Sequence, residues 1–171
     1  MTQTYVFTDG STFNNQKNKN QKTVGGIGVY FGDNDPRNVS EPYCDKIVTN
    51  NRTELTAVIK AIKNHVSNTN KEKQKLIIYS DSQYVIKSMT EWIHKWKKNN
   101  WKTANGKNVL NQDLITYLDD LISGSSSWLE IEFQHVRAHK KEPAAGSEEY
   151  RLWYGNMMAD KFATDGSRKT K

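Results

Sequence analysis

The spacing of hydrophobic residues changes at Asn51, and this change limits the possible folds more than any other feature of the chain. Before Asn51, strand-like patterns occur at residues 5–9, 25–30 and 43–49, separated by polar or turn-rich stretches. From Asn51 to Val66, apolar residues recur at the spacing of an amphipathic helix. Three consecutive strands followed by a helix indicate an antiparallel meander that leads into an α/β arrangement.

The rest of the chain alternates strands with helices. We expect the first strand to finish in a turn at Gly10-Ser11 and residues 14–22 to form a polar loop. A short apolar run at 76–79 is typical of a buried strand. The remaining expected elements are helices at 83–98, 112–122 and 157–164 and a strand at 129–136. The sequence therefore predicts an α/β fold with a five-stranded mixed sheet, in which parallel strands follow the meander.

Composition narrows the class of protein. The 171 residues fit one domain, expected at 1–165, with a flexible basic tail at 166–171. The single cysteine, Cys44, excludes an internal disulfide and favours a reducing compartment. Residues 1–7 carry neither a basic leader nor a long apolar stretch, so we expect a protein that is cytoplasmic, or located wherever replication occurs in its host cell, and that is neither secreted nor bound to a membrane. A net charge of +6 suggests a polyanionic partner.

Two predicted strands end almost alike, each with an aspartate between small polar residues. Residues 7–11 read Phe-Thr-Asp-Gly-Ser, and residues 79–83 read Tyr-Ser-Asp-Ser-Gln. If these strands are parallel neighbours, Asp9 and Asp81 emerge at the same carboxyl edge, where open α/β sheets place their sites. Taken singly, each aspartate could simply cap a turn or a helix. Taken as a pair, they favour a functional site.

Two more acidic residues lie on predicted helices. Glu54 precedes Val58 by four residues in the first turn of its helix, which places it on the inward stripe. Asp160 lies one turn after Asn156 in a helix of small and apolar residues. The alternative for both is a solvated position on the helix surface. If they face the same edge as Asp9 and Asp81, four carboxylates converge.

Converging carboxylates need a cation, because they repel one another and raise their own pKa values. Oxygen ligands alone select hard cations such as Mg²⁺ or Mn²⁺. Two such ions could activate a water on one side of a phosphodiester and stabilise the leaving oxygen on the other. Acyl transfer is disfavoured, since no serine or cysteine is recognisably paired with a histidine. The pattern therefore predicts phosphoryl chemistry.

Segments spread over nearly the whole chain resemble, in order and spacing, the motifs of type 1 ribonuclease H, a family of the retroviral-integrase-like superfamily. These segments are residues 8–11 (TDGS), 49–55 (TNNRTEL), 80–85 (SDSQYV), 92–103 (WIHKWKKNNWKT), 111–114 (NQDL), 136–139 (VRAH) and 155–159 (GNMMA). One short motif would be weak, whereas several in register are highly specific. The resemblance implies the ribonuclease H-like fold and a metal-dependent endonuclease.

The resemblance also implies roles. The reaction would be sequence-independent, two-metal-ion hydrolysis of the RNA strand in RNA–DNA hybrids, during DNA replication among other settings, giving 5′-phosphate and 3′-hydroxyl ends. The enzyme would act as a monomer with Mg²⁺, or with Mn²⁺ in its place. His139 would be a mobile histidine that assists water activation or product departure. Asp9, Glu54, Asp81 and Asp160 would be the metal ligands.

Residues 140–154 make the segment between His139 and Asp160 longer than in the commonest members, and this segment could contact substrate or only pack on the domain.

The expected substrate contacts fall into three groups. Neutral side chains at Asn50, Asn51 and Gln83 suit the 2′-hydroxyls of RNA in a minor groove. By resemblance, Thr49 and Asn111 would hold a DNA phosphate. Residues 92–103, called the Trp-Lys segment below, would line the DNA-strand channel through Trp92, Trp96, Lys97 and Lys98. Turn formation, capping and core packing are the alternatives for these residues.

Two other functions remain open at this point. One is a related nuclease on the same fold, such as a Holliday-junction resolvase or the nuclease domain of a transposase or reverse transcriptase. A resolvase would not need the asparagines, Gln83 and the Trp-Lys segment. The other is a hybrid-binding module without catalysis, against which the intact acidic positions argue.

Overall fold

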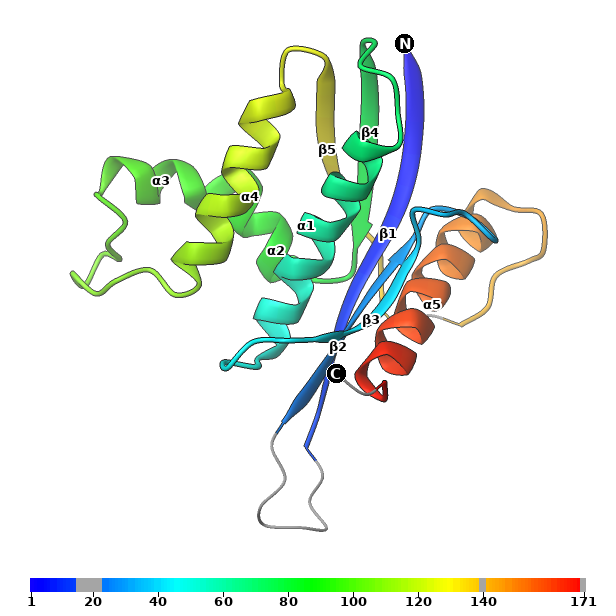
Figure 1. The fold of residues 1–171 in the computed structure, drawn as a ribbon, viewed down its shortest axis with the longest axis horizontal. Helices are drawn as coiled ribbons and strands as arrows, with labels where there is room; N and C mark the ends of the chain where they lie inside the picture. The colour runs from blue at the N-terminus through cyan, green and yellow to red at the C-terminus, as the bar shows by residue number, and fades with distance from the viewer. Residues whose placement is uncertain (15–22, 139–140, 170–171) are drawn as a thin grey trace.

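The computed structural model describes residues 1–14, 23–138 and 141–169 of the chain. A five-stranded sheet in the order β3-β2-β1-β4-β5 forms its centre (Figure 1). β1, β2 and β3 pair antiparallel, whereas β4 is parallel to β1 and β5 is parallel to β4. The strands are β1 (Thr2–Phe13), β2 (Val24–Tyr30), β3 (Val39–Tyr43), β4 (Gln74–Ser80) and β5 (Leu129–His135). The predicted meander followed by parallel strands is confirmed.

Helices cover both faces of the sheet, because apolar side chains of β1 point alternately to one face and to the other. Val6 faces the larger core with α1, whereas Phe7 faces a second core under α5. Successive strand residues point to opposite faces, so one apolar strand can support both layers. The helices are α1 (Asn50–Ser67), α2 (Gln83–Lys87), the π-helical turn η1 (Ser88–Trp92), α3 (Ile93–Lys98), α4 (Gln112–Ser125) and α5 (Glu148–Ser167). None of the described helices is long and apolar enough to cross a bilayer.

Two strand predictions were wrong. No turn forms at Gly10-Ser11, because β1 continues to Phe13 and its last residues pair with β2. The third strand occupies Val39–Tyr43 rather than residues 43–49. Its proline, Pro42, looks unfavourable for a strand but is tolerated because β3 is an edge strand, where a missing N–H can face solvent. Residues 15–22, most of the expected loop, lie outside the described residues.

Two helix predictions also need correction. The helix expected at 83–98 is interrupted by the π-helical turn η1. The closing helix begins at Glu148, nine residues earlier than the expected start at Met157, with Ser147 as N-cap accepting a bond from the Tyr150 N–H. A serine N-cap followed by Glu148 and Glu149 is a good helix start that the polar composition concealed. α5 runs to Ser167, two residues into the segment expected to be a tail.

Candidate active site

Three carboxylates from separate parts of the chain meet at the carboxyl edge of the parallel strands. One ligand oxygen from each of Asp9, Glu54 and Asp81 lies within 4.8 Å of the others. β1 and β4 are paired in parallel with Thr8 opposite Ser80, so the next residues, Asp9 and Asp81, stand at the same level. The strand register thus brings together two aspartates that are 72 positions apart in sequence.

Gly10 brings the third carboxylate to this edge. A Cβ atom at this position would lie 2.3 Å from Thr53 Oγ1, so only glycine lets α1 approach β1 this closely. Thr53 and Glu54 are both buried in the first turn of α1. The predicted inward position of Glu54 is therefore confirmed, and it arises from a close contact between helix and strand.

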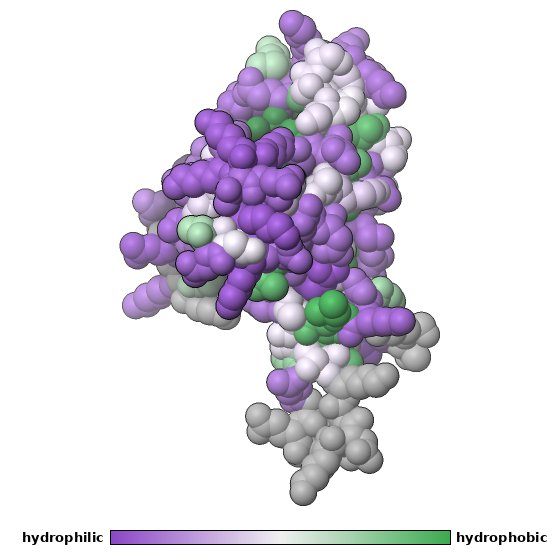
Figure 2. Space-filling view, turned by 90° about the vertical axis from the view of Figure 1, so that its left-hand side faces the viewer, coloured by the Kyte–Doolittle hydropathy of each residue, from purple (hydrophilic) through white to green (hydrophobic). Residues whose placement is uncertain are grey.

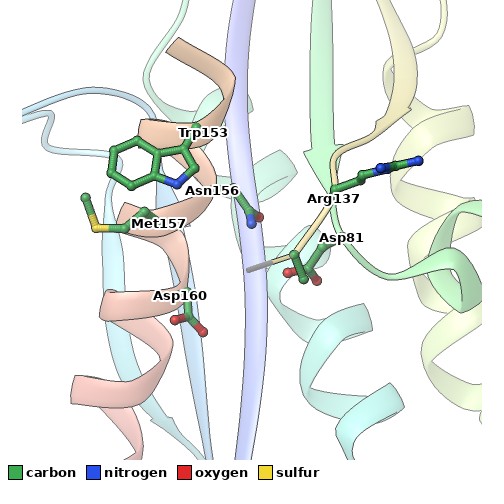
Figure 3. A pocket seen from close by; sticks show the side chains of 7 residues that line it. Asp81, Arg137, Trp153, Asn156, Met157 and Asp160 are labelled. Atoms are coloured by element: carbon green, nitrogen blue, oxygen red, sulfur yellow. The ribbon is translucent and has the colours of Figure 1, made fainter. Parts of the chain in front are cut away.

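Asp160 reaches the site from the opposite face of the sheet. α5 packs tightly on β2, where a Cβ atom on Gly28 would lie 2.0 Å from the Ala159 carbonyl oxygen, and Gly28 pairs with Asp9. Asp160 is exposed and lines a pocket that also contains Asp81 (Figure 3). It is not one of the three carboxylates that cluster within 4.8 Å. It stands across the pocket from Asp81, yet it is close enough to the cluster to help raise the pKa values of Asp9 and Glu54.

The electrostatics of the cluster are unfavourable without a cation. Burial raises the pKa of Asp9, and the charges of Glu54 and Asp81 raise it further. Burial likewise raises the pKa of Glu54, although hydrogen bonds with Asp9 and the Gly10 N–H partly offset the shift. Glu54 Oε2 is buried and accepts no hydrogen bond from the described residues. Three acidic side chains with an unused oxygen form a donor set that suits a hard divalent cation.

The pocket beside the carboxylates contains side chains that the sequence analysis did not assign. Arg137, Trp153, Asn156 and Met157 line it together with the two aspartates, and Figure 3 shows Asn156 between Trp153 and Asp81. Asn156 is 7% exposed, and among the described residues its Oδ1 has no hydrogen-bond partner. Its position four residues before Asp160 was the available signal, since residues at that spacing share a helix face.

His139 and Lys140 lie outside the described residues, so the expected role of His139 stays a prediction. The segment that follows them is partly helical. Arg151 of α5 lies over the Tyr5 ring at 4.5 Å, and Tyr154 donates to Asp33 at 3.1 Å. For these two residues the structure shows packing on the domain, whereas Trp153 lines the pocket with the carboxylates.

The Trp-Lys segment forms α3 and its flanks on one side of the molecule, on a surface dominated by hydrophilic side chains (Figure 2). Trp92 and Trp96 are half-buried, with ring centroids 6.0 Å apart, and Trp96 also packs on the main core. Lys97 pairs with Asp119 of α4 at 2.8 Å, while Lys98 is exposed. The core-packing alternative therefore holds in part for Trp96, and an ion pair engages Lys97.

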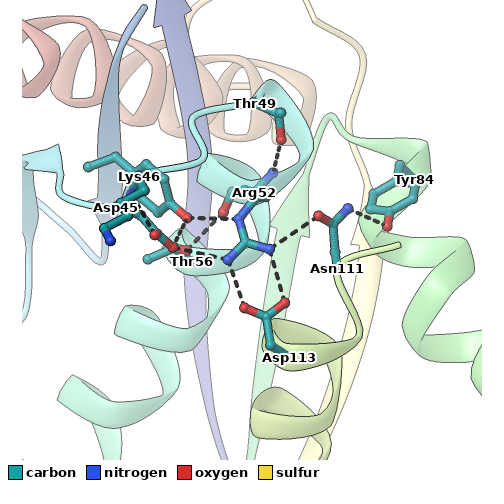
Figure 4. Close-up of polar contacts among 9 residues, drawn as sticks. Asp45, Lys46, Thr49, Arg52, Thr56, Tyr84, Asn111 and Asp113 are labelled. Atoms are coloured by element: carbon teal, nitrogen blue, oxygen red, sulfur yellow. Dashed lines mark hydrogen bonds and ion pairs between the residues drawn. The ribbon is translucent and has the colours of Figure 1, made fainter. Parts of the chain in front are cut away.

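The other expected substrate residues gather around the starts of three helices. Asn50, Asn51 and Gln83 are exposed. Thr49 caps α1 by accepting a bond from the Arg52 N–H. Asn111 contacts the Arg52 guanidinium and the Tyr84 hydroxyl (Figure 4). Sequence reasoning missed Arg52, although it stands within the quoted motif at 49–55.

Known proteins resemble this chain along nearly its whole length. The model of the RNase H family matches residues 1–168. Ribonuclease H of Schizosaccharomyces pombe is 40% identical over 162 residues, which are 95% of this chain but 52% of that protein. Ribonuclease HI of Haemophilus ducreyi is 42% identical over 163 residues, covering 95% of this chain and 88% of the bacterial protein. The chain thus spans about half the length of the yeast relative.

A solved structure shares the fold. The foamy viral protease-reverse transcriptase in complex with an RNA/DNA hybrid aligns with 98% of this chain and 20% of its own, with a TM-score of 0.69 and 21% sequence identity. The match of the family model over residues 1–168 shows the family, and the five-stranded sheet is consistent with it. This chain belongs to the ribonuclease H family.

Proposed function

We propose that the chain hydrolyses the RNA strand of RNA–DNA hybrids without sequence specificity, by two-metal-ion catalysis, leaving 5′-phosphate and 3′-hydroxyl ends. The observation that carries the proposal is the convergence of Asp9, Glu54 and Asp81 at one edge of the sheet. Relatives named ribonuclease H and a structural neighbour that holds an RNA/DNA hybrid support the substrate class.

Asp9, Glu54, Asp81 and Asp160 would hold Mg²⁺ or Mn²⁺. When bound, such ions supply electrophilic activation of a phosphodiester and stabilise the charge that develops during hydrolysis. The carboxylates would hold the cations at the edge of the sheet where the scissile phosphate is expected, and without a cation their negative charges would repel that phosphate. His139 would hold or move a proton at the attacking water or the leaving oxygen.

The surface around this cluster offers contacts for both strands. Asn50, Asn51 and Gln83 are exposed close in sequence to Glu54 and Asp81, and their neutral groups can both donate to and accept from a 2′-hydroxyl. Thr49 and Asn111 would bind a DNA phosphate, and the Trp-Lys segment would follow the DNA strand through Trp92, Trp96, Lys97 and Lys98. Because these contacts are proposed to reach sugars and phosphates rather than base edges in the major groove, cutting should not depend on sequence.

Cleavage assays test the proposal directly. With Mg²⁺ the chain should cut end-labelled RNA in a hybrid and should leave a DNA duplex of the same sequence intact. Asp81→Asn should abolish turnover, because it removes a ligand with little change in volume. Asp120→Asn is the matched control, since Asp120 is an exposed aspartate on α4, and it should cut at the wild-type rate. Equal cutting of hybrid and DNA duplex would contradict the substrate class.

Binding without turnover separates the enzyme from a hybrid-binding module. A module would bind the hybrid equally with Mg²⁺ and with EDTA and would release no shortened RNA. The enzyme should produce fragments only with the cation, and their ends should accept ligation as 5′-phosphates. Hybrid bound but never cut, at any Mg²⁺ or Mn²⁺ concentration, would rule out the catalytic proposal.

A further inference from the structure

Arg52 is a buried cation that ties the start of α1 to the start of α4. The residue is 6% exposed, and its guanidinium donates two bonds to the Asp113 carboxylate at 3.0 and 2.8 Å. It also donates to Asp45 at 3.0 Å (Figure 4) and to the Tyr43 hydroxyl at 3.2 Å. These bonds hold the guanidinium in one orientation, because its five donors lie in a rigid plane.

That orientation decides which way the Asn111 amide points. Arg52 Nη1 lies 3.3 Å from Asn111 Oδ1, and a guanidinium has donors only, so the amide oxygen must face it. The amide nitrogen then points away and donates one hydrogen to the Tyr84 hydroxyl at 2.9 Å. Within the described residues no bond uses its second hydrogen. One donor of Asn111 therefore remains available for an acceptor from outside the chain.

The backbone at Asn111 supports a role other than helix capping. Asn111 is the N-cap of α4, a position at which asparagine side chains usually accept a bond from the helix. Here the side chain makes no cap bond, and the residue has φ 61° and ψ 22°, in the left-handed region. Such a conformation is uncommon outside glycine. The chain thus keeps this amide on Arg52 and Tyr84 and leaves the helix end without its usual cap.

Thr49 is oriented by the backbone of the same arginine. Thr49 Oγ1 accepts a hydrogen bond from the Arg52 N–H at 3.2 Å. Because the oxygen already accepts this bond, the hydroxyl hydrogen is directed elsewhere and can donate. Thr49 is exposed, so that hydrogen can reach a ligand. Position 52 therefore leaves one free donor on each of two side chains, on Asn111 through the guanidinium and on Thr49 through the backbone N–H.

We propose that Arg52 is a positioning residue that aims the donor hydrogens of Thr49 and Asn111 at the phosphate backbone of the DNA strand. Arg52 is itself buried and would touch substrate only through these two side chains. This inference rests on the proposed function, which assigns Thr49 and Asn111 to a DNA phosphate. It adds that the affinity for this phosphate depends on the direction of the Asn111 amide, which the buried Arg52 guanidinium sets.

Asn111→Asp tests the amide direction without emptying the site. The carboxylate still accepts from Arg52, but it has no hydrogen to donate and it repels a phosphate. Losing a hydrogen bond to a charged group should raise KM for the hybrid about 10- to 100-fold. The value of kcat should stay within about twofold, because the reacting phosphate lies elsewhere. Thermal stability should not fall, since Arg52 gains a charged partner.

Arg52→Lys and Asp120→Asn complete the comparison. A lysine cannot reach Asn111 and Asp113 as a planar fork does, so Arg52→Lys should also raise KM. Adding Arg52→Lys to Asn111→Asp should raise KM no further, because both changes remove the same donor. Asp120→Asn is the control: Asp120 is an exposed aspartate of α4 that is not among the hydrogen-bond partners of Arg52, so KM should be unchanged.

Hybrid affinity should be measured by fluorescence anisotropy in EDTA as well as by KM. A single methylphosphonate placed along the DNA strand should weaken wild-type binding at one position, and Asn111→Asp should be insensitive to it there. If the wild type cuts no hybrid, the proposed function fails, and the anisotropy series still tests the subsite. If the wild type binds hybrid but Asn111→Asp binds it equally well, Arg52 positions no substrate contact.

Discussion

A Cβ atom on Gly10 would lie 2.6 Å from the backbone nitrogen of Glu54. This distance is shorter than any ordinary contact, so β1 and the first turn of α1 touch backbone to backbone. This contact determines the distance between two of the carboxylates. Gly10 directly follows Asp9, and the close approach of α1 to Gly10 sets the position of Glu54. Gly10 thus contributes to the geometry of the acidic cluster without contributing any side-chain atom.

Gly10→Ala should therefore displace α1 and separate Glu54 from Asp9. Overpacking of this kind costs about 1 to 3 kcal/mol of unfolding free energy. Activity should fall more than stability alone explains, because Mg²⁺ affinity depends on the spacing of the carboxylates. Chemical denaturation and a Mg²⁺ titration of hybrid cleavage measure the two effects. Gly124→Ala is the control: among the described residues, nothing beyond its own turn of helix lies within 4 Å of its Cβ position, and alanine is favoured in a helix by up to about 1 kcal/mol.

Without a divalent cation, stability should fall as pH rises above the ordinary carboxyl range. The pKa values of Asp9 and Glu54 are raised in the folded chain, mainly by burial, so the folded state binds protons more tightly than the unfolded state. The resulting stabilisation is complete below the unfolded pKa, near 4, and is lost as pH rises through the folded pKa, which is about 8 for Glu54. Melting curves in EDTA between pH 4 and pH 9 would show the decline. A flat profile would mean that folding does not raise the pKa values of Asp9 and Glu54.

Mg²⁺ should reverse that loss. A ligand that binds only the folded state at ten times its Kd adds about 1.4 kcal/mol of stability. The Mg²⁺-dependent rise in melting temperature should therefore be larger at pH 8 than at pH 5, where protons compete for the same oxygens. Asp81→Asn should reduce this rise. It should also stabilise the metal-free chain, because it removes one of the charges that raise the pKa values of Asp9 and Glu54. If Mg²⁺ shifted the variant as much as the wild type, Asp81 would not be a ligand.

The two lysines of α3 should differ in their contribution to hybrid binding. Lys98 is exposed, whereas Lys97 is paired with Asp119. If Lys98 neutralises a DNA phosphate, Lys98→Gln should lower the slope of log Kd against log salt by about one. Lys97→Gln should lower it less, because its counter-charge is already partly supplied by Asp119. Anisotropy titrations between about 50 and 200 mM salt would give both slopes. Identical slopes for both variants and the wild type would place α3 away from the DNA strand.

The sequence alone determined which carboxylates to consider and which elements carry them. The spacing of apolar residues located α1, α4, β4 and the meander. Burial of one face repeats apolar residues every two positions in a strand and every three to four positions in a helix. The paired endings at Asp9 and Asp81 already pointed to one edge of a parallel sheet. The sequence predicted element boundaries less well where contacts with other elements determine them. Pro42 lies in an edge strand, and the start of α5 is a polar helix turn that carries little apolar pattern.

Only the tertiary structure decided how these residues meet. Three features depend on atoms from elements distant in sequence: the close contact at Gly10, and the oxygens of Glu54 and Asn156 that find no hydrogen-bond partner in the described parts of the chain. The same is true of Arg52. Its position in the sequence indicated only the first turn of a helix, whereas its guanidinium bonds to α4, which begins 60 residues later. Periodicity reports which face of an element is buried, but not what it is buried against. Packing between elements therefore supplied the geometry that the residue pattern could not contain.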